Sequence, residues 1–138
     1  MSFEEIFDAS YERILKREID GRCFFDAFYV NFINASPEIR EKFKHTDMLH
    51  QQKMLKKSFY NLLVFYATNN VDNYLIRIAK QHNRNHLNIP PPLYDLWLDT
   101  LLKTVADYDP EFSSTIELSW RLVLSTGITY MKFKYDHE

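Results

Sequence analysis

The chain has 138 residues, a net charge of −2 and a single cysteine, Cys23. This length is enough for one domain with its own core, and we expect residues 1–138 to form one. The near balance of charge argues against nucleic-acid binding, and one cysteine excludes an intrachain disulfide or a cysteine-based metal cluster. No apolar run approaches the ~18 residues of a membrane span, and Glu4 and Glu5 stand where a signal peptide carries basic residues. We therefore expect a cytoplasmic protein with no membrane or nucleic-acid partner.

The spacing of apolar residues predicts an all-α chain. Only 2 glycines and 5 prolines occur, and between them apolar residues recur at helical spacing. Gly21 separates the first two helices, and Ser36-Pro37-Glu38 and Asp109-Pro110-Glu111 each give a cap, a first-turn proline and an acid. Thr46 or Asp47 can cap the longest middle helix. The predicted helices cover about residues 2–18, 22–34, 37–43, 47–66, 72–85, 92–106 and 110–134.

Two helices carry unusual inner faces. The helix over about 22–34 has an almost wholly aromatic stripe, and aromatic residues make up 16% of the chain. In the helix over about 47–66, Gln51 interrupts a stripe that is otherwise apolar. In the last helix Gly127 costs ~1 kcal/mol of helix propensity, which predicts close packing of another helix or a bulky neighbour at that point.

His82 is the residue with the strongest functional signal. It follows Leu75, Ile78 and Ala79 at the spacing of one buried helical stripe. A buried imidazole without a partner costs on the order of 1–3 kcal/mol, so its second nitrogen must meet a hydrogen bond, a metal or water. A haem iron would supply such a partner.

Four local patterns, spread over about residues 20–135, together resemble the bacterial single-domain globins related to flavohaemoglobins and to sensor globins. The resemblance implies a three-over-three helical sandwich around a haem pocket. The patterns are Phe28-Tyr29 followed by Ser36-Pro37-Glu38 and Phe43; Thr46-Asp47-Met48-x-x-Gln51; His82 followed by Leu87-Asn88-Ile89-Pro90 and Leu93-Tyr94; and Asp109-Pro110-Glu111 through Tyr130.

The resemblance also implies a site. His82 would be the ligand of a haem b iron, and His86 would replace it if the helix register slipped. On the opposite side of the haem, Tyr29 and Gln51 would donate hydrogen bonds, and other registers put Gln52 or Leu55 in place of Gln51. The remaining implied pocket residues are Phe28, Phe43, Leu55, Ile89, Tyr94, Leu98 and Met131.

Reversible binding of O₂, and also of NO and CO, is the function that this resemblance implies. Three roles stay open: oxygen binding or transport, NO detoxification, and gas sensing through a partner chain. The chain has no glycine-rich dinucleotide motif, so any enzymatic turnover would need an external reductase. We expect a monomer or homodimer. The alternative is a haem-free, globin-like helical interaction or regulatory module.

Overall fold

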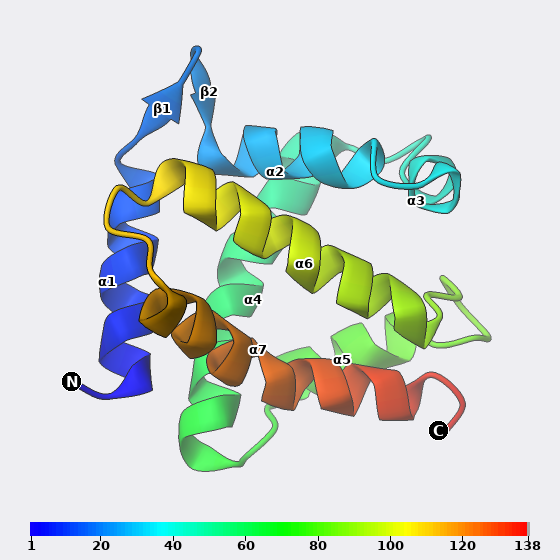
Figure 1. The fold of residues 1–138 in the computed structure, drawn as a ribbon. Coiled ribbons are helices and arrows are strands. Elements are labelled where there is room, and N and C mark those ends of the chain that lie inside the picture. Colours follow the sequence, from blue (N-terminus) through cyan, green and yellow to red (C-terminus); the bar gives the residue numbers. More distant parts are fainter. Residues whose placement is uncertain (138) are drawn as a thin grey trace.

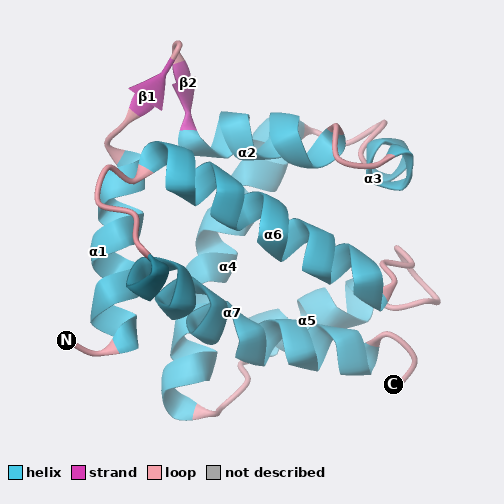
Figure 2. Cartoon of the chain, in the orientation of Figure 1, coloured by secondary structure: helices cyan, strands magenta, loops and turns pink. Residues whose placement is uncertain are grey.

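The computed structural model describes residues 1–137, which form seven helices and one short hairpin (Figure 1). The expected all-α architecture is confirmed, since the only strands in that range are two residues long (Figure 2). The elements are α1 (Phe3–Leu15), β1 (Glu18–Ile19), β2 (Arg22–Cys23), α2 (Phe24–Ile33), α3 (Pro37–Lys42), α4 (Met48–Thr68), α5 (Asn73–His82), α6 (Pro91–Tyr108) and α7 (Ser114–Lys134). None of these helices is long and apolar enough to cross a bilayer.

Side-chain caps fix where most of the helices begin. The Ser2 hydroxyl accepts from the backbone of Glu5 at 3.1 Å, and Glu5 reaches back to complete a capping box on α1. Ser36 caps α3 ahead of its first-turn proline. Asp47 rather than Thr46 caps α4. Because these caps satisfy backbone N–H groups that have no partner inside the helix, they set the helix starts within a residue or two of the prediction.

Within the described range, six of the seven helices form two layers of three, and the short α3 follows α2. One layer holds α1, α4 and α5, and the other holds α2, α6 and α7. Helix α7 packs against all three helices of the first layer, while α2 packs along α6. Figure 1 shows α6 and α7 crossing in front of α4, with α5 beside the C-terminal half of α7. The two layers are therefore joined mainly through α7.

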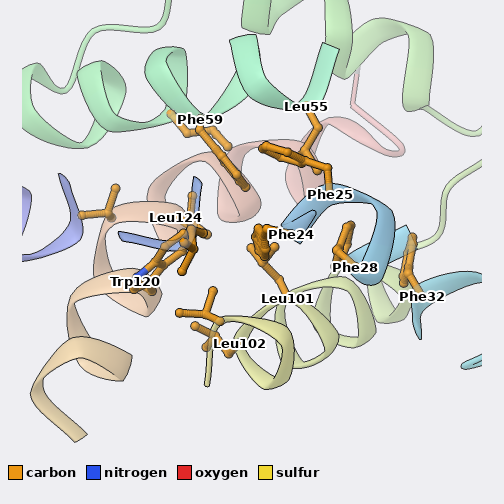
Figure 3. Packing of buried hydrophobic residues seen from close by; sticks show 14 of the residues in the cluster. Phe24, Phe25, Phe28, Phe32, Leu55, Phe59, Leu101, Leu102, Trp120 and Leu124 are labelled. Atoms are coloured by element: carbon orange, nitrogen blue, oxygen red, sulfur yellow. The ribbon is translucent and has the colours of Figure 1, made fainter. Parts of the chain in front are cut away.

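Aromatic side chains fill the centre of the fold (Figure 3). Trp120 of α7 is fully buried, and its ring lies 4.5 Å from that of Phe7 of α1 and 5.9 Å from that of Phe59 of α4. The aromatic stripe predicted for α2 is buried as a whole, with Phe25, Phe28, Tyr29 and Phe32 among the core residues. The excess of aromatic residues is thus used largely for packing between layers.

Three predicted helix ends are wrong. Helix α1 ends at Leu15 because residues 18–23 form an antiparallel hairpin, whose turn at Asp20 and Gly21 has positive φ values of 53° and 77°. Helix α5 ends at His82 instead of residue 85. Helix α7 begins at Ser114, capped by Ser113, and not at residue 110.

The late start of α7 follows from a buried ionic junction at Asp109. Its carboxylate accepts from Ser10 at 2.6 Å, from Arg13 at 2.7 and 2.9 Å, and from the backbone N–H of Glu111 at 2.9 Å, so the turn that Asp109 caps is tied to α1 and does not continue as a helix. The Asp109 side chain is fully buried, and the indole of Trp120 donates to the same Ser10 hydroxyl at 2.9 Å. This junction joins α1 to the link between α6 and α7.

Gly127 lies where α4 and α7 approach each other closely. A Cβ atom at this position would overlap Cδ2 of Leu62, a buried side chain of α4. The prediction of a close helix contact at Gly127 is therefore confirmed.

Candidate functional site

His82 ends α5 and is held by a bond within its own helix. Its Nδ1 lies 2.8 Å from the carbonyl oxygen of Ile78. A carbonyl can only accept, so Nδ1 carries the proton and Nε2 carries the lone pair of the neutral ring. Burial lowers the pKa of His82 and outweighs the opposing effect of the Ile78 hydrogen bond, which favours this neutral form. An imidazole in this state is ready to bind a metal through Nε2.

The segment after His82 folds back onto the end of α5. Backbone N–H groups of residues 87, 88 and 89 donate to the carbonyl oxygens of residues 81, 83 and 82, at 3.0, 2.8 and 3.0 Å. His86 belongs to this segment, is exposed, and places its Nδ1 2.8 Å from the side-chain oxygen of Asn83. His86 therefore does not lie one turn further along the helical face of His82, because α5 has already ended.

Tyr29 of α2 and Gln51 of α4 meet across the layers. The Gln51 amide donates to the Tyr29 hydroxyl oxygen at 3.3 Å. Since the oxygen accepts in this bond, the phenolic hydrogen stays available for another acceptor. Burial raises the pKa of Tyr29 to about 12, against a smaller lowering effect of the Gln51 bond, so the phenol is a hydrogen-bond donor at neutral pH.

The two other candidates on α4 have different surroundings. Gln52 turns to the start of α2 and donates to the Asp26 carboxylate at 2.7 Å. Leu55 is buried in the core beside Phe25, as Figure 3 shows. Of the three residues considered for this position, Gln51 is the one that contacts Tyr29.

The other predicted site residues divide by burial. Phe28 is fully buried, whereas five others are half-buried. Phe43 ends α3 with its ring 5.9 Å from that of Tyr29. The half-buried residues are Phe43, Ile89, Tyr94, Leu98 and Met131.

Two polar atoms among the predicted site residues have no hydrogen-bond partner in the described part of the structure. They are Nε2 of His82 and the hydroxyl of Tyr94, and burial strongly raises the pKa of Tyr94. Within residues 1–137, every fully shielded side-chain nitrogen or oxygen of a residue that is not exposed has a partner. Both atoms are therefore at least slightly accessible at their surface.

One contact near the site could not be read from the sequence. Tyr135, just after α7, donates its hydroxyl hydrogen to the Asn88 side-chain oxygen at 2.5 Å, and its carbonyl accepts from the backbone of Arg84 at 3.0 Å. Asn88 has a φ of 55°, a conformation that asparagine tolerates better than most residues. An asparagine two residues before a proline was the only local signal of this turn.

Comparison with known proteins assigns the family. No protein-family profile and no curated protein matches the chain. Among solved structures, the chain is similar to a Pseudomonas aeruginosa PAO1 protein described as structurally highly homologous to a human haemoglobin. The two are 36% identical, the match covers 97% of this chain and 98% of that one, and the TM-score is 0.88.

A likeness of this extent defines the fold as that of a globin, and the two layers of three helices are its three-over-three sandwich. The chain belongs to the bacterial single-domain globins. The fold that the sequence resemblance implied is thus confirmed.

The residues present fit a haem group, which globins in general hold. Residues 1–137 hold no group of three or more acidic, histidine or cysteine side chains that could bind a metal ion directly. Metal-binding histidines usually donate their second ring N–H to a carboxylate or a backbone carbonyl, as His82 does to Ile78. One imidazole nitrogen without a hydrogen-bond partner among the described residues, on a ring held by a backbone carbonyl, is the protein ligand that a haem iron requires.

Proposed function

We propose that this protein binds haem through His82 and reversibly binds O₂, and also NO and CO, on the side of Tyr29 and Gln51. The observation that carries the proposal is that one side chain offers a free ligand atom for iron and another offers a free hydrogen for the gas ligand. His82 offers an unprotonated Nε2, and Tyr29 offers an unused phenolic hydrogen. A ferrous haem supplies an open coordination position for a diatomic gas.

The chain's own residues have separate tasks in this proposal. His82 binds the iron, and its bond to Ile78 fixes the ring orientation and tautomer. Tyr29 donates a hydrogen bond to a gas ligand that carries partial negative charge, and Gln51 orients the phenol from α4. Phe43 and the other half-buried apolar residues exclude water from the haem faces.

The cofactor that we propose is haem b, held without a covalent bond, in one domain spanning residues 1–138. Covalent haem attachment uses a Cys-x-x-Cys-His motif. The only cysteine here, Cys23, precedes α2, 59 positions before His82, and no histidine follows it closely.

Absorption spectroscopy tests the proposal. Protein purified after haem supplementation should show a Soret band, and its ferrous form should change spectrum with CO and return to the starting spectrum when CO is removed. Absence of a Soret band after supplementation would contradict haem binding and favour the haem-free interaction module. A ferrous spectrum that does not respond to CO would contradict an accessible iron.

A further inference from the structure

A pocket, called here the α4 cavity, lies where the end of α1 and the start of α2 meet one face of α4. Its volume is about 250 Å³. The α4 residues that line it are spaced as one helical stripe, at positions 49, 52, 53 and 56. Gln51, the residue that contacts Tyr29, is not part of the lining.

The walls of this cavity are mainly apolar. Phe24 and Phe25 at the start of α2 are buried, whereas Leu15 is 44% exposed and Leu49 is 72% exposed. Two exposed leucines beside a cavity leave apolar surface in contact with water, which burial under an apolar ligand would remove. Benzene fills a cavity of about 150 Å³, so this one suits an apolar group of roughly eight to ten carbon atoms.

The edge of the cavity is positively charged. Lys53 and Lys56 both line it, and within residues 1–137 neither forms an ion pair. The Lys56 ammonium lies 5.5 Å from the centre of the Phe25 ring, so its charge stays beside the apolar wall. Two acidic residues lie next to lining residues: the Asp26 carboxylate accepts from Gln52 at 2.7 Å, and Glu18 is paired with Cys23 in the hairpin. In the same range, neither forms an ion pair with Lys53 or Lys56.

From this combination we propose that the cavity binds a free medium-chain monocarboxylate. The apolar chain would cover Leu15, Leu49 and the two phenylalanines, and the carboxylate would lie near Lys53 and Lys56. A neutral apolar compound would leave both lysines unpaired, and a cationic one would be repelled by them. The site does not depend on haem, so it goes beyond the function proposed above.

Titration with sodium octanoate, followed by amide NMR shifts, tests this site in the protein as purified. Any haem present is kept in the ferrous CO form, so that the iron position is already occupied. Saturable shifts are expected at residues 23–25 and 49–56. Each methylene that enters the cavity should tighten binding about fourfold, so hexanoate should bind roughly 15-fold more weakly than octanoate.

Lysine variants test the charged edge. Lys53→Gln and Lys56→Gln should each weaken octanoate binding about two- to fivefold, as expected for exposed ion pairs. The neutral octan-1-ol should bind to the wild type about as weakly as octanoate binds to the variant that carries both substitutions. Lys57→Gln is the matched control, because Lys57 neighbours Lys56 in sequence but lies over the Tyr74 ring at 4.5 Å, outside the cavity.

Several results would overturn the proposal. Equal weakening by Lys57→Gln would show unspecific charge attraction. Equal affinity for butanoate and octanoate would show that no apolar chain is buried. Shifts centred on Tyr29 or His82 would place octanoate in the haem site, and the lack of any saturable shift at low millimolar octanoate would leave no site at all. A protein without a Soret band that still binds octanoate here would contradict only the haem proposal.

Discussion

The two sides of the proposed haem site are built by different means. His82 is oriented by a carbonyl only four residues earlier in its own helix, and the segment after it folds back through backbone bonds to residues 81–83. Tyr29 and Gln51 come from two helices in different layers, 22 residues apart, and meet through one side-chain bond of 3.3 Å. The His82 side is therefore set by local structure, while the Tyr29 side depends on how α2 and α4 are packed.

This difference predicts different responses to substitution. Local backbone bonds keep the geometry around His82 as long as α5 is folded, so haem binding on that side depends on whether the imidazole nitrogen is present. A single side-chain pair between two helices can be weakened without loss of the fold, so changes at Tyr29 or Gln51 should alter gas binding by degrees.

The largest expected effect is that of His82→Ala. Removing the Nε2 of His82, which has no hydrogen-bond partner within residues 1–137, should abolish stable haem binding, or leave haem that regains a five-coordinate spectrum only with added imidazole. His86→Ala is the matched control and should keep a near-native ferrous spectrum, because His86 is exposed and contacts Asn83. Absorption spectra of the two variants decide the matter, and the reverse pattern would refute the assignment of His82.

Asp109→Asn should lower stability without affecting either side of the site. Replacing the carboxylate weakens its charged bonds to Arg13 and Ser10, and a bond to a charged group is worth about 1.5–3 kcal/mol. Chemical denaturation at pH 7 measures this loss. The exposed pair of Asp99 with Arg121 supplies the control, where Asp99→Asn should change stability by no more than about 0.5 kcal/mol. A changed CO-form spectrum in Asp109→Asn would show that the junction does reach the site.

The contribution of Asp109 should depend on pH. Burial acts to raise the pKa of its carboxyl, but the bonds from Arg13, Ser10 and the Glu111 backbone prevail and lower it. The folded pKa is then below the unfolded value of about 3.9, so the stabilisation is complete above that pH and is lost as pH falls through the folded pKa. The stability difference between wild type and Asp109→Asn should therefore be constant near neutrality and shrink below about pH 4. A difference that stayed constant in acid would mean that the charge contributes nothing.

Tyr29→Phe should weaken O₂ binding without abolishing it, as expected for the side of the site that depends on one side-chain pair. Loss of a hydrogen bond worth about 1.5–3 kcal/mol should raise the O₂ dissociation rate by roughly one to two orders of magnitude. CO release should change little, because bound CO carries less negative charge than bound O₂ and gains less from a hydrogen-bond donor. Stopped-flow kinetics would measure both rates. Gln51→Ala should act in the same direction but more weakly, and the double variant should fall short of additivity if Gln51 works through the phenol. An unchanged O₂ rate would reduce Tyr29 to a core aromatic residue.

The same contrast explains what could be predicted from the sequence. The stripe ending at His82 is periodic, and its members Leu75, Ile78 and Ala79 are buried as predicted. The position of Gln51 rather than Gln52 beside Tyr29 depends on the rotation of α4 against α2, which a one-residue shift would change, so sequence alone left both open.

A long-range polar contact and a short hairpin account for two of the errors in the predicted helix ends. Asp109-Pro110-Glu111 has the composition of a helix start, yet Asp109 binds α1 residues about 100 positions away, and the start moves to Ser113 and Ser114. The hairpin at residues 18–23 was missed because strands of two residues show no alternation. Local chemistry predicted which segments are helical, and tertiary contacts decided where some of them begin and end.

The smallest expected effect concerns Tyr135, which supports the His82 side from outside. Its hydroxyl is bonded to Asn88 in the segment that folds back onto α5, so Tyr135→Phe should loosen this segment while leaving the bond of His82 to Ile78 in place. A hydrogen bond of this kind is worth about 0.5–1.5 kcal/mol, so haem transfer to an apo-globin acceptor should become about two- to tenfold faster. Tyr60→Phe, at an exposed tyrosine of α4, is the control and should leave the rate unchanged. Equal rates for wild type and Tyr135→Phe would mean that the local backbone bonds of residues 87–89 hold the His82 side without help from the chain end.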